Sequence, residues 1–175
     1  EGNALIRNRE HILRKGYFKD TAAKSQFRPM WNWFYDNRKK FKSIELAGPY
    51  SVYGEWCWAQ HGIYYNRLPD WFIAYDIYDS DKQSWLAPPI ARQLLQEAGF
   101  QIPVLKFAGE VDHDYAKFVA WANEPAAWAD SKAEGIYVKV YDKGYITHRF
   151  KMVRSDFVRG ALWSPDKINK NKVKS

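Results

Sequence analysis

The sequence is poor in residues that cross-link a chain or anchor it in a membrane. It has 175 residues and one cysteine, Cys57, which excludes an intramolecular disulfide framework. It shows neither the pattern of a secretory leader nor a long uncharged apolar run, so we expect no membrane partner and a reducing compartment such as the cytoplasm. For His61 we expect a structural hydrogen bond rather than a zinc site.

Positive charge and aromatic rings are abundant instead. Lys and Arg number 27 against 20 Asp and Glu, and a formal charge of +7 indicates a polyanionic partner such as nucleic acid. Aromatic residues make up 18% of the chain, including nine Trp, which suits either a dense core or platforms for stacked bases. Cys57 lies among aromatic residues, so we interpret it as a small core residue rather than a catalytic thiol.

The order of apolar patterns predicts a single α+β domain with antiparallel sheets and helices packed outside them. Helices are expected at 30–41, with a basic face at Arg38 to Lys40, at 88–98 before a stop at Gly99, and at 112–122. Strands are expected at 4–8, 12–16, 51–58, 72–78, 102–107, 135–141 and 145–153, the last two forming a hairpin.

Several short motifs follow one another along these elements. They are Gly54-Glu55, His61-Gly62-Ile63-x-Tyr65 with Leu68-Pro69, an apolar run ending in Tyr75-Asp76, Glu134-Gly135, and Arg149-x-Lys151. In this order they resemble the motifs of covalent nucleotidyltransferases, above all ATP-dependent RNA ligases of the RNA ligase 2 type. The resemblance extends from Glu1 to about Val158 and implies the ATP-grasp-like nucleotidyltransferase domain of nucleic-acid ligases.

The resemblance also implies a role for each motif residue. Glu55 would bind the ribose of ATP, Tyr75 would stack on the adenine, and Glu134 would hold Mg²⁺ or Mn²⁺. Arg149 and Lys151, which alternate onto one face of a strand, would contact the phosphates and act in catalysis with Glu134. Taken singly, Glu134 also fits a solvated turn, Lys151 an exposed strand position and Tyr75 the core. The remaining nucleotide-binding candidates are Glu1, Gly2, Asn3 and Arg14, with Lys15 as the alternative to Arg14.

The first family motif, Lys-x-Asp-Gly or a close variant, carries the lysine that becomes linked to AMP. Glu1-Gly2 resembles its end, so we expect the nucleophile two residues before Glu1, in an N-terminal segment missing from this sequence. The alternative is a true deletion or a processed form.

We divide the chain into a nucleotidyltransferase domain at 1–163 and a basic tail at 164–175. That tail is expected to be solvated and frayed, with nucleic-acid contact or a link to another domain as alternatives.

The predicted function is therefore an RNA ligase that uses ATP to seal 5′-phosphate and 3′-hydroxyl ends, as in RNA repair. It would act through a lysyl-AMP intermediate and an adenylylated polynucleotide, with RNA ends and an accessory domain or protein as partners. Alternatives are a DNA ligase, a GTP-dependent capping-type nucleotidyltransferase, or a non-catalytic nucleic-acid-binding module if the upstream lysine is absent.

Overall fold

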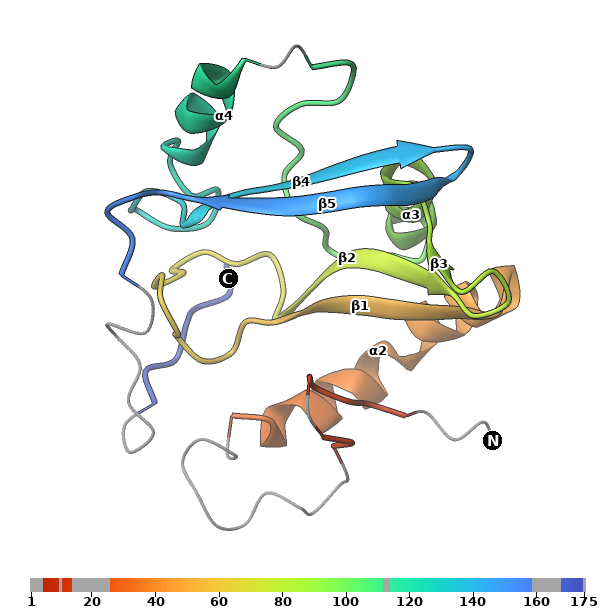
Figure 1. Cartoon of the computed structure of the whole chain (residues 1–175). Helices are drawn as coiled ribbons and strands as arrows, with labels where there is room; N and C mark the ends of the chain where they lie inside the picture. Colours follow the sequence, from red (N-terminus) through yellow and green to blue (C-terminus); the bar gives the residue numbers. More distant parts are fainter. Residues whose placement is uncertain (1–4, 10, 14–25, 112–113, 159–167, 175) are drawn as a thin grey trace.

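Two antiparallel sheets face each other in the computed structural model, which describes residues 5–9, 11–13, 26–111, 114–158 and 168–174 (Figure 1). A three-stranded sheet has the order β1 (Tyr50–Trp56), β2 (Phe72–Asp79), β3 (Ser84–Trp85), and a hairpin consists of β4 (Gly135–Asp142) and β5 (Tyr145–Val153). Three described helices, α2 (Arg28–Ala47), α3 (Pro88–Glu97) and α4 (Tyr115–Ala122), pack outside these sheets. The predicted α+β class is confirmed. Within the described ranges, none of the helices has the length and apolar character needed to cross a bilayer.

Helix α2 covers one face of β1 and is longer than the sequence predicts. It begins with Pro29 in its first turn and ends at Gly48, and it buries Ile44 against the sheet. The prediction that Lys40 belongs to an exposed basic face is wrong. Its ammonium lies 5.9 Å from the centre of the Trp33 ring and 3.6 Å from an oxygen of Asp70, so this lysine turns inward over the aromatic cluster.

The main core lies between the helices and the three-stranded sheet. Helix α3 buries Ala91 and Leu95 against Ala74 and Ile77 of β2. The helix starts at Pro88, as predicted, and the chain leaves it through Gly99 at a φ of 84°, a conformation that glycine adopts without strain.

The hairpin is attached to the larger sheet at its turn. The turn uses left-handed backbone at Lys143 and Gly144, and the amide of Ala87 donates to the carbonyl of Gly144 at 2.7 Å. On the face away from the larger sheet, Phe150 contacts Phe118 of α4 with ring centres 6.1 Å apart. The opposite face of the hairpin, which carries Tyr137, Lys139, Arg149 and Lys151, therefore looks toward β1 and β2.

One predicted strand, residues 102–107, does not form. Gln101 makes a single parallel bridge to Ile73, and the following residues pair with no strand among the described residues. Pro103 lacks the amide that a ladder needs, and its carbonyl instead accepts from the Arg92 guanidinium at 2.9 Å. Near the N-terminus, the strands expected at 4–8 and 12–16 are not assigned among the described residues, which form one isolated antiparallel bridge between Arg7 and Ile12.

The expectation of a solvated, frayed tail is wrong for residues 168–174. Asn171 is 2% exposed, Lys170 bridges to Ala59, and Val173 bridges to Leu68. This segment packs along the loop that joins β1 to β2 (Figure 1). The backbone amides and carbonyls of that loop are not paired in a regular sheet, and the segment supplies hydrogen-bond partners for several of them.

Replacing Gly135 by Ala should destabilise the fold. A Cβ at this position would overlap the carbonyl oxygen of Met152 on the paired strand and lie 2.8 Å from the Cα of Val153, so the hairpin would have to part at this end. We expect a loss of about 2 kcal/mol in the free energy of unfolding, measured by urea denaturation. Thr147→Ala, at an exposed position of the same hairpin, is the control. Equal stability of the two variants would contradict this account.

Candidate nucleotide site

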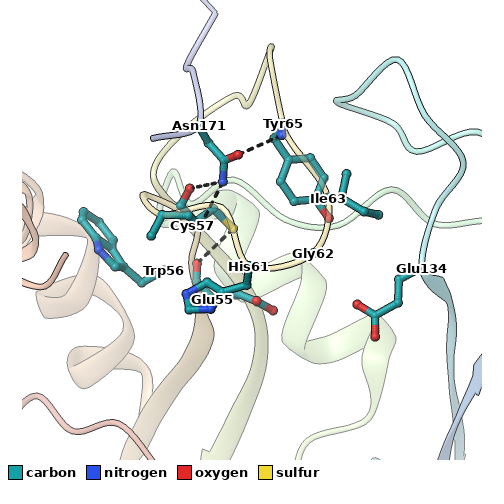
Figure 2. A pocket seen from close by; sticks show the side chains of 10 residues that line it. Glu55, Trp56, Cys57, His61, Gly62, Ile63, Tyr65, Glu134 and Asn171 are labelled. Atoms are coloured by element: carbon teal, nitrogen blue, oxygen red, sulfur yellow. Dashed lines mark hydrogen bonds between the residues drawn. The ribbon is translucent and has the colours of Figure 1, made fainter. Parts of the chain in front are cut away.

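Two predicted carboxylates come together at one shallow pocket. Glu55 lies next to the end of β1 and Glu134 directly precedes β4, and both side chains point into the space between the sheets (Figure 2). The loop after β1 forms the rest of the wall, together with a residue of the C-terminal segment. The full lining is Glu55, Trp56, Cys57, Ala59, His61, Gly62, Ile63, Tyr65, Glu134 and Asn171.

A register shift in β2 places two consecutive side chains toward this space. Tyr53 pairs with Asp76 while Gly54 pairs with Ala74, so Tyr75 is the extra residue of a bulge. Ala74 and Ile77 both face the core, which leaves Tyr75 and Asp76 on the side of the hairpin. A regular strand would have sent either Tyr75 or Asp76 into the core.

Asp76 ties the two sheets together. Its side chain is 2% exposed, and the ammonium of Lys139 donates to its Oδ1 at 2.5 Å and to the carbonyl of Tyr75 at 2.8 Å. Arg149 lies across the hairpin from Lys139, and its Nη1 is 3.8 Å from Asp76 Oδ2, an atom that accepts no hydrogen bond among the described residues. The Arg149 guanidinium also lies over the ring of Trp85, 4.3 Å from its centre.

The third cation of this face, Lys151, pairs with the second pocket carboxylate. Its ammonium donates to Glu134 Oε1 at 2.5 Å, with 46% of the lysine side chain and 33% of the glutamate side chain exposed. The structure thus brings Arg149 and Lys151 to one face, as the sequence predicts, and opposite Asp76 and Glu134. An exposed ion pair of this kind contributes little to stability and is readily exchanged for other partners.

Tyr75 lies in a polar environment beside the pocket. Burial raises the pKa of its hydroxyl, and the charges of Glu55 and Asp76 and the nearby Tyr137 hydroxyl raise it further, while Arg9 lowers it. The Lys139 ammonium is 5.8 Å from the centre of the Tyr75 ring and 5.6 Å from that of Tyr137. Tyr75 therefore remains protonated at neutral pH and presents a ring next to a row of cations.

Cys57 is half-buried and lines the pocket rather than lying in the core as expected, whereas His61 has the expected structural surroundings. Burial, followed by the charge of Glu55, raises the pKa of the Cys57 thiol, so the reactive thiolate is disfavoured. His61 Nε2 lies 3.1 Å from Gln26 Oε1, which agrees with the predicted structural hydrogen bond. Burial lowers the pKa of His61, partly offset by Glu55, and keeps the imidazole neutral near pH 7.

The four candidates near the start of the chain, Glu1, Gly2, Asn3 and Arg14, lie outside the described residues, as does Lys15. Among the residues that are described, no three His, Cys, Asp or Glu side chains converge on a metal position. Glu134 at the pocket is nevertheless a suitable donor for Mg²⁺, which takes one or two carboxylates and completes its shell with phosphate oxygens and water.

Sequence reasoning missed Lys139, Asp76 and Asn171 as parts of the site. Lys139 could not be placed opposite Arg149 from the turn alone, because Val140 pairs with His148 whereas Tyr141 pairs with Ile146. Because of this second register shift, each pair farther from the turn than Tyr141 and Ile146 is displaced by one residue. Asn171 had no detectable signal, since its contacts are with residues more than 100 positions away.

Comparison with known proteins gives one match. The model of a family described as RNA ligase matches residues 2–153, which include the five motifs from Gly54-Glu55 to Arg149-x-Lys151. No curated protein and no solved structure matches the chain.

Removing the Lys139 charge should destabilise the protein, because Asp76 would keep a buried charge with only the more distant Arg149 beside it. For Lys139→Met we expect a loss of about 3 kcal/mol in the free energy of unfolding, measured by urea denaturation. The matched control is Lys106→Met, whose ion pair with Glu124 leaves 37% and 39% of the two side chains exposed. That change should cost less than about 1 kcal/mol. Comparable losses in the two variants would show that the Lys139–Asp76 pair stabilises the fold no more than an exposed ion pair does.

Proposed function

Because this chain belongs to the RNA ligase family, we propose that the pocket between its two sheets binds ATP and supports sealing of RNA 5′-phosphate and 3′-hydroxyl ends through a covalent lysyl-AMP intermediate. The observation that carries the proposal is the charged face of the hairpin. Lys139, Arg149 and Lys151 form a row of cations beside a pocket that also holds Glu55 and Glu134. Such a surface suits a triphosphate with a bound metal ion.

The reaction would proceed in three transfer steps: AMP moves first to the lysine and then to the RNA 5′-phosphate, and the RNA phosphoryl group is finally transferred to the 3′-hydroxyl. A lysine amine attacks the α-phosphorus of ATP, loses a proton and releases pyrophosphate. The 5′-phosphate of the RNA then attacks the same phosphorus, which breaks the lysine bond and leaves a 5′-adenylylated RNA. The 3′-hydroxyl of the other end finally attacks the RNA phosphorus, loses its proton and releases AMP.

The described residues would bind and orient the nucleotide. Glu55 contacts the ribose hydroxyls, and Tyr75 offers its ring to the adenine, since it is beside Glu55 and turned out of the core by the bulge. Arg149 and Lys151 hold the phosphates and offset the charge that develops during each attack.

Glu134 and Lys151 would change partners when ATP binds. In the structure they neutralise each other across 2.5 Å at the edge of the pocket. Mg²⁺ or Mn²⁺ held by Glu134 and the phosphates would lower the barrier by neutralising phosphate charge. Lys151 would then be released to contact a phosphate oxygen, a charge-assisted hydrogen bond of the same kind as the one it gives up.

Lys151→Ala, made in a form of the protein that gains one AMP when incubated with ATP and Mg²⁺, should abolish formation of the AMP adduct. The lost ammonium is the phosphate contact proposed for the attack, and the intact mass after incubation with ATP and Mg²⁺ measures the outcome: the parent gains one AMP and the variant none. Lys82→Ala, in the exposed turn between β2 and β3, is the matched control. AMP transfer by Lys151→Ala at the parental rate would refute the role assigned to this lysine. An adduct formed with GTP in place of ATP would favour a capping-type enzyme.

The last transfer needs no lysine nucleophile, and so it can be tested in the chain as it stands. Given a 5′-adenylylated RNA and an RNA with a free 3′-hydroxyl, with Mg²⁺ and without ATP, the chain should release AMP and produce the joined RNA on a denaturing gel. Arg149→Ala should reduce the rate at least tenfold, because a cation that faces the phosphates is lost. A folded chain that binds AMP but joins no adenylylated end would support a non-catalytic binding module instead. Equal joining of DNA ends would favour a DNA ligase.

A further inference from the structure

The segment 168–174 completes the pocket although it lies outside the residues that match the family model. It runs beside the loop between β1 and β2, and Asn171 from this segment appears at the pocket wall in Figure 2. Backbone hydrogen bonds attach the segment to this loop along its length. The Gln60 amide donates to the Asn169 carbonyl at 2.8 Å, and the Leu68 amide donates to the Lys172 carbonyl at 2.9 Å.

Asn171 makes the densest set of these contacts. Its side-chain amide donates to the carbonyls of Cys57 at 2.8 Å and Ala59 at 3.2 Å, and its Oδ1 accepts from the amide of Tyr65 at 2.9 Å. Its own backbone amide donates to the Trp58 carbonyl at 3.0 Å. One side chain thus joins the two ends of the stretch 57–65, which carries His61, Gly62 and Ile63 of the pocket lining.

The neighbours of Asn171 fix the segment in place. The ammonium of Lys170 lies 5.5 Å from the centre of the Trp58 ring and 5.0 Å from that of Trp71, and Val173 bridges to the fully buried Leu68. Trp58 belongs to the stretch 57–65, and Leu68 and Trp71 follow it in the chain, so these contacts tie the segment to this loop. Asn171 is therefore held at a defined position and can define the position of the loop in turn.

We propose that Asn171 is a positioning residue for nucleotide binding: by bonding both ends of the stretch 57–65, it holds that loop against Glu55 and forms the pocket before ATP arrives. The inference rests on the proposed function of this pocket. Without Asn171, the carbonyls of Cys57 and Ala59 and the amide of Tyr65 lose their partners, and the loop must rearrange to reach water. Nucleotide binding then has to order the loop, which weakens affinity.

The test compares Asn171→Ala and Asn171→Asp with Asn169→Ala, an exposed asparagine two positions earlier in the same segment. Both Asn171 variants should bind ATP roughly tenfold more weakly by calorimetry, since buried backbone groups lose hydrogen bonds, whereas Asn169→Ala should bind as the parent does. Asp keeps the acceptor for Tyr65 but removes both donors and adds a negative charge. In hydrogen exchange, the Tyr65 amide should exchange faster in Asn171→Ala without nucleotide.

A variant of the distant core separates positioning from general stability. Ile44→Ala, which truncates a side chain of α2 that is 2% exposed, should lower the melting temperature without changing ATP affinity or Tyr65 exchange. If Asn171→Ala does not fold, Asn171→Ser and Asn171→Asp carry the same comparison. If a folded Asn171→Ala variant binds ATP with the parental affinity, the inference is overturned while the proposed function stands. A parent chain that binds no nucleotide would reject the proposed function and the inference with it.

Discussion

The buried charge of Asp76 is the constraint on which the arrangement of the two sheets depends. A carboxylate that is 2% exposed has to be neutralised nearby, and both of its cations, Lys139 and Arg149, come from the hairpin. These ion pairs therefore hold the hairpin against β2. A second attachment, the hydrogen bond from the Ala87 amide to the Gly144 carbonyl, holds it at the turn. This orientation directs Lys151 toward Glu134 and leaves the pocket open beside them.

Two register shifts make this electrostatic arrangement possible. The bulge at Tyr75 brings Asp76 out of the core, and the shift after Val140 sets Arg149 rather than His148 opposite Lys139. The first shift allows Ala74 and Ile77 both to face the core while Tyr75 and Asp76 face the space between the sheets, and the second determines which residue of β5 lies opposite Lys139. The site is therefore built from irregularities in otherwise ordinary antiparallel pairing.

The sequence predicted the elements well and the side-chain geometry only in part. Periodicity and Pro/Gly signals located α3 and the hairpin, and motif order identified Glu55, Tyr75, Glu134, Arg149 and Lys151, which the structure places around one space. The strand expected at 102–107 failed because apolar residues alone do not supply a partner edge or replace the missing amide of Pro103. Lys139 depended on a register shift, and Asn171 on contacts between distant parts of the chain, neither of which leaves a local signal.

The Asn171 contacts also determine when the pocket can form during synthesis. Its side chain bonds to residues 106, 112 and 114 positions earlier, which are among the longest separations in the described part of the chain. A polypeptide emerging from the ribosome presents its N-terminal portions first, so the two sheets can assemble while the loop after β1 still lacks this partner. Closure of such distant contacts is also slow once the whole chain is available. The pocket between the sheets is consequently completed late in folding, after residue 171 has left the ribosome.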